Sequence, residues 1–348
     1  MKEYLYNLAT DKTLGFWAWF VKFFLLLASF LYGAIIRGLM LFYKFRQVQL
    51  PCKVISIGNI TMGGTGKTSL VEFISRYLKS KGHNVAVLSR GYNRLAEEMG
   101  DEPFMLSRSL GDIPVIVGHD RVSNAKRAMK EYGVDTVILD DGMQQWRLKK
   151  DLDIVTISST QGFGNRHMIP RGILRQPLAS LRQADIFVLT KTDLSGSLDN
   201  IKDYLNEVNP NAPVTESVHQ ALGFYDINDP DKVFGPGHLK GKAAAIFSGI
   251  GDPDSFTKLT SSLGVKINLD LKFGDHHNYA EEDLENIVSQ AVTLNLDTII
   301  TTEKDAARLN EEKLKPFKGF KVLVLRVALK ITKNEELLFA GLSGLYTL

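Results

Sequence analysis

The hydrophobic pattern of the chain changes at Pro51. Before it, residues 14–45 form a nearly continuous apolar stretch, in which fourteen uncharged residues separate Lys22 from Arg37. As a helix these fourteen residues rise about 21 Å. With Lys22 extended toward the surface, the stretch reaches the roughly 20 residues that a bilayer core requires. We expect a membrane-bound helix that either spans the bilayer or lies in one leaflet, and a buried core helix is the alternative.

After Pro51, short apolar runs alternate with amphipathic segments. Strands alternating with helices indicate a mostly parallel sheet with helices on both faces. The runs predict strands at Lys53–Ile57, Val85–Leu88, Thr136–Leu139, Ile154–Ile157, Ile186–Leu189, Ala243–Phe247, Lys266–Leu271 and Thr298–Thr301. The segments between them predict helices at Lys67–Ser80, Arg121–Tyr132, Pro253–Leu263 and Glu281–Leu294.

The fold class expected from this pattern is α/β, with a P-loop NTPase-like parallel sheet and a second, smaller α/β lobe. The Gly-, Pro- and Asp-rich stretch 228–242 is a candidate connector. We therefore predict a membrane-associated segment over 1–50, a P-loop core over 51–227, and a second lobe over 228–348 whose C-terminus returns to the core. A cleft between the two lobes would hold the active site.

Charge and cysteine content refine this picture. Residues 1–50 hold six lysines and arginines against Glu3 and Asp11, a net +4, so the rest of the chain sums to about −1 of the total +3. A basic excess beside an apolar stretch suits a surface of anionic lipid, whereas the small total does not indicate nucleic acid. Cys52 is the only cysteine, so no disulfide forms within the chain, and we expect the globular part to lie in the cytoplasm.

A glycine-rich loop follows the first predicted strand. It reads GNITMGGTGKT over residues 58–68 and leads directly into a helix. Backbone N–H groups of such a loop bind phosphate oxygens at the helix N-terminus, here from Gly63, Gly64, Thr65 and Gly66. Lys67 would reach the β- and γ-phosphates, and the Thr68 hydroxyl would join the Mg²⁺ shell. The sequence therefore predicts a nucleotide site.

Two further groups of polar residues follow predicted strands. Asp140 and Asp141 end the run Val137–Leu139, where an acidic residue holds Mg²⁺ directly or through water. The loop after Val85–Leu88 contains Arg90, Tyr92, Asp101 and Glu102, and it borders the γ-phosphate if ligands bind beyond the carboxyl ends of the strands. On pattern alone, Asp101 is a turn residue before Pro103.

Together these motifs resemble the tetraacyldisaccharide 4′-kinase family, the lipid A 4′-kinases. The resemblance covers nearly the whole chain, beginning with the apolar N-terminal stretch. The other motifs that carry it are GNITMGGTGKT at 58–68, LSRGY at 88–92, GDEP at 100–103, LDDGMQ at 139–144, ILRQPLASLRQAD at 173–185, FSGIGDPDSF at 247–256, FGDHHNY at 273–279 and TTEKDAARL at 301–309.

The resemblance implies that the chain transfers the γ-phosphate of ATP to the 4′-hydroxyl of tetraacyldisaccharide 1-phosphate, giving lipid IVA. ATP and Mg²⁺ would be the cofactors, the acylated disaccharide the substrate, and the cytoplasmic face of the inner membrane the location. We expect a monomer without a nucleic-acid partner.

The resemblance also implies residue roles. Lys67 and Thr68 would bind the triphosphate and Mg²⁺, and Asp140, Asp141 and Glu102 would serve the metal. Asp101 would be the general base, assisted by a histidine of the Asp275-His276-His277 run. Position favours His276, but His277 stays open. The candidates for the substrate phosphate or sugar are Arg90, Tyr92, Arg121 and Arg175, because arginine suits bidentate phosphate contacts.

The sequence departs from the family pattern in two places. Gln145 stands where the family usually has a histidine, and it hydrogen-bonds but carries no positive charge. The stretch 168–173 also differs from the usual substrate loop. Two other functions compete with the kinase: a P-loop GTPase, suggested by Thr190-Lys191-Thr192-Asp193, and a membrane-anchored nucleotide-binding module without catalysis.

Overall fold

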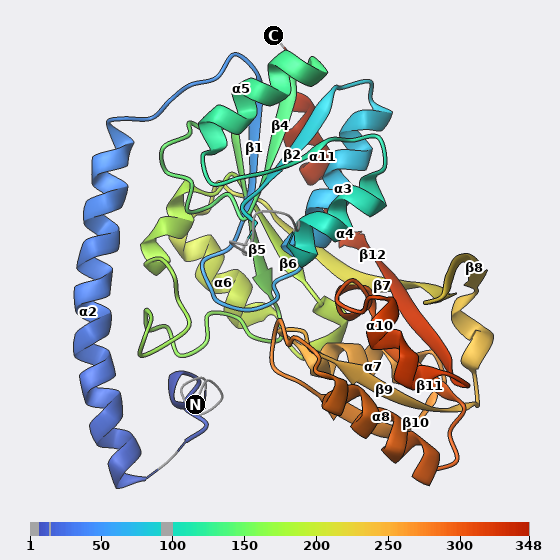
Figure 1. Ribbon diagram of the computed structural model, residues 1–348. Coiled ribbons are helices and arrows are strands. Elements are labelled where there is room, and N and C mark those ends of the chain that lie inside the picture. The colour runs from blue at the N-terminus through green and yellow to red at the C-terminus, as the bar shows by residue number, and fades with distance from the viewer. Residues whose placement is uncertain (1–6, 14, 92–99, 348) are drawn as a thin grey trace. The chain divides into compact units, whose positions relative to one another are not determined.

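The computed structural model describes residues 7–13, 15–91 and 100–347, and of Asp101 only the backbone. The chain divides into two compact units (Figure 1). The first unit contains Met1–Glu98, Ser109–Val218 and Ile331–Leu348, and the second contains Met99–Arg108 and His219–Lys330. Residues 99–108, which we expected in the P-loop core, thus belong to the second unit.

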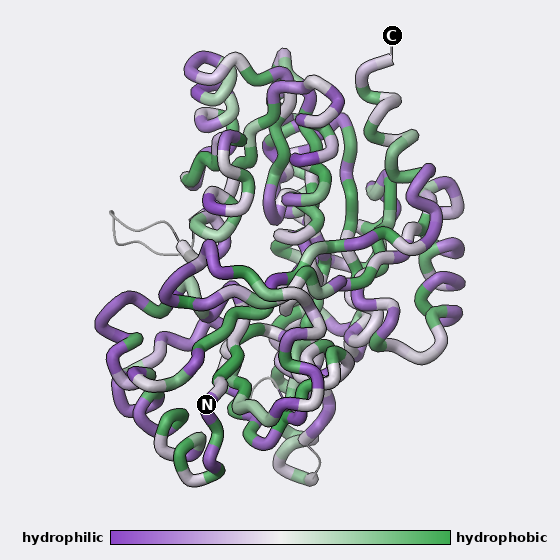
Figure 2. Tube along the Cα trace, turned by 90° about the vertical axis from the view of Figure 1, so that its right-hand side faces the viewer, coloured by the Kyte–Doolittle hydropathy of each residue, from purple (hydrophilic) through white to green (hydrophobic). Residues whose placement is uncertain are grey.

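A parallel sheet forms the centre of the first unit. Its strands follow the order β7-β6-β5-β1-β4-β2-β3, and every pairing between neighbours is parallel. The central strands are hydrophobic along most of their length (Figure 2), as expected for strands that are covered on both faces. The strands are β1 (Lys53–Gly58), β2 (Val85–Ser89), β3 (Val115–Val117), β4 (Thr136–Asp140), β5 (Leu152–Ser158), β6 (Ile186–Thr190) and the first part of β7 (Val214–Asp226). The predicted α/β class with a parallel sheet is confirmed.

Helices and short 3₁₀ turns connect these strands. They are α3 (Lys67–Ser80), α4 (Asp101–Leu110), α5 (Arg121–Tyr132), η1 (Leu178–Gln183), η2 (Thr192–Leu194) and α6 (Asp199–Val208). Capping residues mark both ends of α5. At its start, the Asp120 carboxylate accepts hydrogen bonds from the backbone N–H groups of Val122 and Ser123, and at its end Gly133 terminates the helix with φ 61°. The prediction that Asp101 lies in a turn is wrong, because α4 begins at this residue. Acidic residues followed by proline suit the first turn of a helix.

The last helix, α11 (Glu335–Gly344), packs on α3 of the first unit. The Phe339 ring stacks on Tyr77 with 4.1 Å between the ring centroids. Beyond α11, the Tyr346 hydroxyl lies 2.7 Å from Thr136 Oγ1 of β4, and its ring stacks on His83. The C-terminal segment therefore contributes both to the helix layer and to the end of a central strand.

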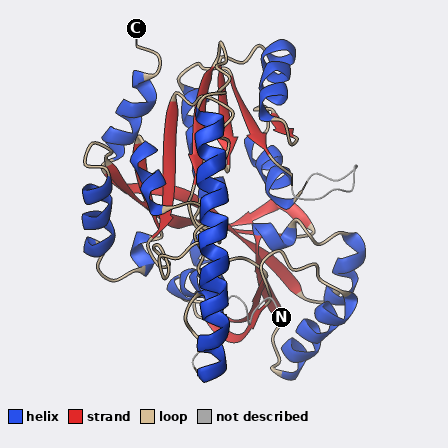
Figure 3. Cartoon of the chain, turned by 90° about the vertical axis from the view of Figure 1, so that its left-hand side faces the viewer, coloured by secondary structure: helices blue, strands red, loops and turns tan. Residues whose placement is uncertain are grey.

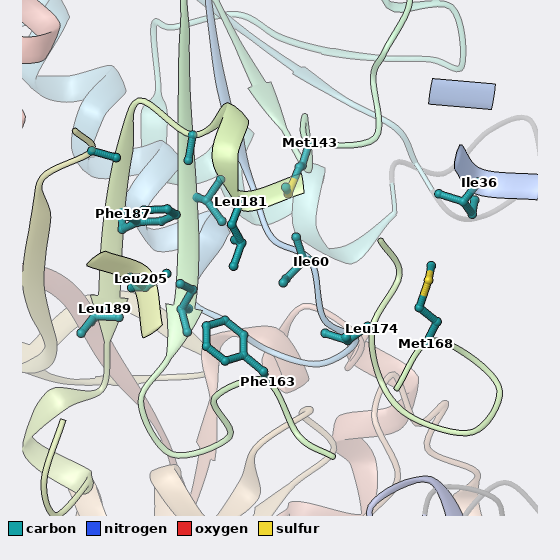
Figure 4. Close-up of a cluster of buried hydrophobic side chains, with 14 residues drawn as sticks. Ile36, Ile60, Met143, Phe163, Met168, Leu174, Leu181, Phe187, Leu189 and Leu205 are labelled. Carbon is teal, nitrogen blue, oxygen red and sulfur yellow. The ribbon is translucent and has the colours of Figure 1, made fainter. Parts of the chain in front are cut away.

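The long helix α2 (Phe16–Lys44), which runs across the front of the view in Figure 3, packs one face against the rest of the first unit. Ile36 joins a buried cluster that contains Ile60, Leu174 and Phe187, and it lies next to Met168 (Figure 4). The opposite face is covered with exposed apolar side chains. They include Phe16, Trp17, Trp19, Phe20, Phe23, Phe24, Leu27, Phe30, Leu31, Ile35, Leu41 and Phe42. Of the helices in the described part of the chain, α2 alone has the length and composition to cross a membrane.

The second unit is a smaller α/β layer. Strands β10-β9-β11-β12 are parallel neighbours, and β7 and β12 run from this unit into the first. The predicted connector over 228–242 is wrong, because β8 and η3 together occupy most of it, and Phe224 of β7 pairs with Phe234 of β8 in an antiparallel ladder. The elements are β8 (Asp229–Phe234), η3 (Pro236–Leu239), β9 (Ala243–Ser248), α7 (Pro253–Ser262), β10 (Lys266–Lys272), α8 (Glu281–Thr293), β11 (Thr298–Thr302), α9 (Glu303–Ala306), α10 (Glu311–Leu314), η4 (Lys315–Phe317) and β12 (Lys321–Lys333).

Candidate active site

The glycine-rich loop connects β1 to α3, as predicted. Gly63 and Gly66 have φ values of 109° and 78°, which a side chain at either position would strain. Two residues of β5 and β6 hold the loop. Thr156 Oγ1 lies 2.9 Å from Thr65 Oγ1, and Thr190 Oγ1 donates to the Thr65 carbonyl at 3.0 Å. The loop therefore rests on the carboxyl ends of neighbouring parallel strands, where α/β sheets bind ligands.

Lys67, the first residue of α3, lies among polar groups at the end of the sheet. Its Nζ donates to Asn59 Oδ1 at 3.0 Å and lies 3.6 Å from Asp141 Oδ1. Asn59 is fully buried, and its amide nitrogen donates to the Thr61 carbonyl. The sequence analysis missed Asn59, since a small polar residue in a glycine-rich loop looks like an ordinary turn residue.

Arg175 joins the same group of side chains. Its guanidinium donates to both carboxylate oxygens of Asp141, at 2.8 and 2.7 Å, and to the Asn59 carbonyl at 2.9 Å. Burial alone would raise the pKa of Asp141, but the hydrogen bonds from Arg175 and the charges of Lys67 and Arg175 lower it far below its ordinary value. Asp141 is therefore a carboxylate balanced by two cations.

The segment that carries Arg175 also links α2 to the phosphate loop. Met62 donates its N–H to the Ile173 carbonyl, and Arg175 donates its own to the Ile60 carbonyl. On the other side, the Tyr32 hydroxyl of α2 donates to the Arg175 carbonyl at 3.1 Å. The stretch 168–175, of which residues 168–173 depart from the family pattern, is thus packed between the apolar helix and the nucleotide site.

Oxygen donors suited to a hard cation lie beside this group. Asp140 ends β4 directly opposite Ile57 of β1, is 3% exposed, and accepts a hydrogen bond from Ser89 Oγ at 3.3 Å. Thr68 is the second residue of α3. A hydroxyl and a carboxylate are ligands that Mg²⁺ prefers. Within the described residues, no group of three or more His, Cys, Asp or Glu side chains is placed to hold a metal ion.

The substrate candidates differ in their surroundings. Arg121 is 3% exposed and donates to the Ser89 carbonyl at 2.8 Å, so it holds the end of β2. Arg90 is exposed and lies 3.5 Å from His119 Nε2. Tyr92 lies outside the described residues. Arg175 is committed to Asp141 and Asn59 in this structure.

Lys191, which belongs to the GTPase-like stretch, contacts the phosphate loop. Its Nζ donates to the Gly64 carbonyl at 3.0 Å, and Ser159 Oγ donates to its carbonyl at 2.6 Å. The residue has φ 58°, in the left-handed region. This stretch therefore supports the glycine loop from the β6 side.

The remaining predicted residues belong to the second unit. Glu102 accepts a hydrogen bond from Lys304 Nζ at 2.5 Å, so its charge is already balanced by a cation. The Asp101 side chain lies outside the described part of the structure. His277 Nε2 lies 2.8 Å from Asp283 Oδ2, and its ring stacks on Phe273.

His276 occupies a different environment from His277. Its backbone is left-handed at φ 58°, its N–H donates to the Gly249 carbonyl, and Arg308 lies 3.3 Å from Nδ1. The side chain is about half exposed. The two adjacent histidines are therefore distinct, with His277 anchored to the first turn of α8 and His276 presented toward solvent.

Comparison with known proteins identifies the family. The profile of the Tetraacyldisaccharide-1-P 4′-kinase family matches residues 21–343. The chain belongs to the tetraacyldisaccharide 4′-kinase family. The predicted family, the enzyme class of ATP-dependent kinase and the function in lipid A biosynthesis are thereby confirmed, and the two competing functions are not supported.

Individual relatives agree with this assignment. The tetraacyldisaccharide 4′-kinase of Halothermothrix orenii is 33% identical, with 91% of this chain and 90% of the relative covered. That of Syntrophus aciditrophicus is 36% identical, with 81% and 86% covered. The crystal structure of LpxK from Aquifex aeolicus in complex with ATP has a TM-score of 0.72 and 26% identity, and covers 94% of this chain and 100% of its own. The tetraacyldisaccharide 4′-kinase fold is thus shared along nearly the entire chain.

Proposed function

We propose that this kinase transfers the γ-phosphate of ATP to the 4′-hydroxyl of tetraacyldisaccharide 1-phosphate, with the phosphate loop as the nucleotide site. The observation that carries the proposal is the placement of Lys67 at the N-terminus of α3, 3.6 Å from Asp141 at the end of β4. A lysine and a carboxylate at the carboxyl ends of adjacent parallel strands are the elements of a P-loop phosphotransferase.

The residues present fit ATP and Mg²⁺. The glycine loop supplies backbone N–H donors at the start of a 14-residue helix, and Lys67 supplies a cation for the phosphates. Because Asp141 is balanced by Arg175 and Lys67, we assign the metal to Asp140 and Thr68. When bound, Mg²⁺ neutralises charge on the phosphate oxygens. Glu102, paired with Lys304, would require that pair to open before it could serve a metal.

We propose Asp101 as the general base and His276 as its partner. As the first residue of α4, Asp101 lies at a helix N-terminus, where the helix dipole stabilises a carboxylate. His277 is held by Asp283 and Phe273, so we assign the assisting role to His276, whose side chain is about half exposed. The sugar hydroxyl loses its proton to Asp101 as its oxygen attacks the γ-phosphorus, and ADP leaves.

We propose that α2 attaches the enzyme to the cytoplasmic face of the inner membrane as a monotopic helix. Its contacts with the protein extend from Lys22, whose Nζ donates to the Thr13 carbonyl, to Met40, which lies 3.9 Å from Ser180 Oγ. The intervening residues rise about 27 Å as a helix, close to the thickness of a bilayer core. A helix that contacts protein along one face over that length keeps only the other face for lipid. One chain carries every motif, so we propose that it acts as a monomer.

The test measures label transfer from [γ-³²P]ATP to tetraacyldisaccharide 1-phosphate. Transfer by the wild-type enzyme, lost with Lys67→Ala and reduced at least about 100-fold in kcat with Asp101→Asn, supports the proposal. His276→Gln should reduce kcat, whereas the adjacent His277→Gln should act mainly on stability. Nucleotide binding by Asp101→Asn should be retained. Absence of transfer by the wild-type enzyme, or strict preference for GTP, would refute the proposal.

A further inference from the structure

The stretch Thr301–Leu309, TTEKDAARL, has no role in the mechanism so far. It covers the end of β11 and the short helix α9. Asp305 in this stretch is completely buried, and Arg308 is 6% exposed at its side chain. Buried charged side chains require partners, and two of the partners found here, Tyr279 and His276, lie in the loop that carries the proposed catalytic histidine.

Asp305 connects three segments of the second unit. Its Oδ1 accepts hydrogen bonds from the Gly249 N–H at 3.0 Å and from the Tyr279 hydroxyl at 2.9 Å. Its Oδ2 accepts from Thr302 Oγ1 at 2.7 Å. The carboxylate therefore ties the end of β11 to the residue that follows β9 and to the histidine-containing loop.

Arg308 extends this network to His276. Its Nη1 donates to Asp305 Oδ1 at 3.0 Å and to the Gly249 carbonyl at 2.9 Å, and its Nη2 lies 3.3 Å from His276 Nδ1. The same Gly249 carbonyl accepts the backbone N–H of His276 at 3.1 Å. The ring and the backbone of His276 are thus fixed by one arginine and one glycine carbonyl.

The direction of the bond to His276 follows from chemistry. A guanidinium has only donors, so Nδ1 of the histidine must accept. In the neutral imidazole the proton then sits on Nε2. Nε2 also faces a negative charge, since Asp275 Oδ1 lies 3.9 Å away. In this tautomer, His276 donates a hydrogen bond from Nε2.

We infer that Arg308 is a positioning residue of this kinase, which holds the His276 ring in the Nε2–H tautomer so that it donates to the carboxylate of the general base. The inference rests on the proposed function of Asp101 and His276. In the transfer, the proton of the sugar hydroxyl passes to Asp101, the new O–P bond forms as the bond to the β-phosphate oxygen breaks, and His276 keeps its Nε2 proton.

A second contact from the same stretch supports the inference. Lys304 binds Glu102, the neighbour of Asp101 in the first turn of α4. TTEKDAARL thus contacts both the segment of the proposed base and, through Asp305 and Arg308, the segment of its histidine. These contacts all lie within the second unit.

The experiment compares Arg308→Gln and Arg308→Lys in the full-length enzyme in detergent. Arg326→Gln is the matched control, because Arg326 belongs to the same unit and pairs with Glu303, but its side chain is 46% exposed. Kinetics are measured with [γ-³²P]ATP and tetraacyldisaccharide 1-phosphate. Ring nitrogens are observed by NMR after ¹⁵N-histidine labelling, and the His276 signals are assigned with His276→Gln.

For Arg308→Gln we expect kcat to fall about 10- to 100-fold, by analogy with the loss seen when the residue that orients a metal-bound histidine is removed. The KM for ATP should stay within about twofold, and the His276 Nδ1 signal should lose its unprotonated character. Arg308→Lys, which restores a donor, should recover part of kcat and of the signal, and Arg326→Gln should match the wild type.

Two results would overturn the inference. One is unchanged kcat in Arg308→Gln. The other is a loss of kcat in Arg308→Gln without any change in the His276 ring signals, since that pattern indicates a purely structural role. If Arg308→Gln does not fold, the same comparison is made with Arg308→Lys. Failure of the wild-type enzyme to transfer phosphate would instead refute the proposed function itself.

Discussion

Arg175 holds Asp141 in a two-point ion pair, with nitrogen–oxygen distances of 2.8 and 2.7 Å, beside the lysine of the phosphate loop. The two residues are 34 positions apart in sequence. Arg175 therefore does more than face a substrate. It fixes the position of the Asp141 carboxylate, which also lies close to the Lys67 ammonium group.

Replacing Arg175 by methionine should weaken both stability and nucleotide binding. Asp141 would be left with Lys67 as its cation, which draws the lysine away from the phosphates. We expect a loss of about 1–3 kcal/mol in the free energy of unfolding at pH 7, below the value for a fully buried pair, and a higher Kd for ATP. Arg127→Met, which breaks an exposed pair with Glu131, is the control and should cost at most about 0.5 kcal/mol.

The effect of Arg175→Met on stability should depend on pH. A carboxylate whose pKa is lowered in the folded state stabilises the fold above the unfolded pKa, near 3.9, and that contribution disappears as the pH falls through the folded value. Urea unfolding should show the difference between wild type and variant shrinking below about pH 4. An equal difference at pH 3 and pH 7 would contradict this account of Asp141.

Ser29 should be important for the attachment of α2 to the first unit. Its hydroxyl donates to the Met168 carbonyl at 2.7 Å and accepts the N–H of Arg171 at 2.9 Å, in a buried position. Ser29→Ala leaves both backbone groups without this partner, so we expect a loss of about 1–3 kcal/mol. The exposed Ser80→Ala should change the free energy of unfolding by less than about 0.5 kcal/mol. If Ser29→Ala and Ser80→Ala changed the thermal unfolding equally, that result would argue against packing of α2 through Ser29.

The outer face of α2 should determine membrane binding. Phe24 and Leu31 are exposed there, and burying a large apolar side chain is worth about 1.5–3 kcal/mol. Replacing both by glutamine should reduce co-flotation with anionic vesicles at least about tenfold while leaving the unfolding transition in place. Tyr32→Phe, on the packed face, should leave co-flotation unchanged and lower the unfolding transition. Undiminished flotation of the double variant would place the membrane contact elsewhere.

Cys52 should resist alkylation in the folded protein. Burial, with smaller contributions from Asp151 and Asp135, raises the pKa of its thiol to about 11. At pH 8 only about one thiol in a thousand is then ionised, so labelling by iodoacetamide should be at least about 100-fold slower than in urea. Because the unfolded thiol ionises first, this group also lowers stability as the pH rises from about 8.5 toward 11, and Cys52→Ala should remove that contribution. Rapid labelling of the folded protein at pH 8 would contradict the buried position.

The sheet was predictable from the sequence, while much of the site was not. Each central strand is a short apolar run bounded by polar residues, and the glycine loop after Lys53–Ile57 has a local signature. By contrast, Arg175 and Asp141 meet only because the strand order places their segments together. The same is true of Lys304 and Glu102, which are 202 positions apart.

Local predictions are uncertain where the same residues are compatible with two different local structures. Asp101 and Pro103 are compatible with a β-turn and with the first turn of a helix. The preceding strand does not distinguish between these two structures. The two histidines look equivalent in sequence, but Asp283, six residues after His277, supplies the partner that distinguishes them. Asp275 directly precedes His276, so the presence of a nearby acidic residue in the sequence does not by itself distinguish the two histidines.

The packing of α11 on α3 has a consequence for the synthesis of the protein. The first unit needs residues 331–348, and Phe339 and Tyr346 from that stretch cover Tyr77 and Thr136. Proteins emerge from the ribosome N-terminus first, and domains generally fold as they are completed. Here the nucleotide-binding unit stays incomplete until residues 331–347 have been synthesised, although its phosphate loop emerges early. Chains truncated before residue 331 would therefore lack the segment that packs on α3 and β4 of the unit with the phosphate loop.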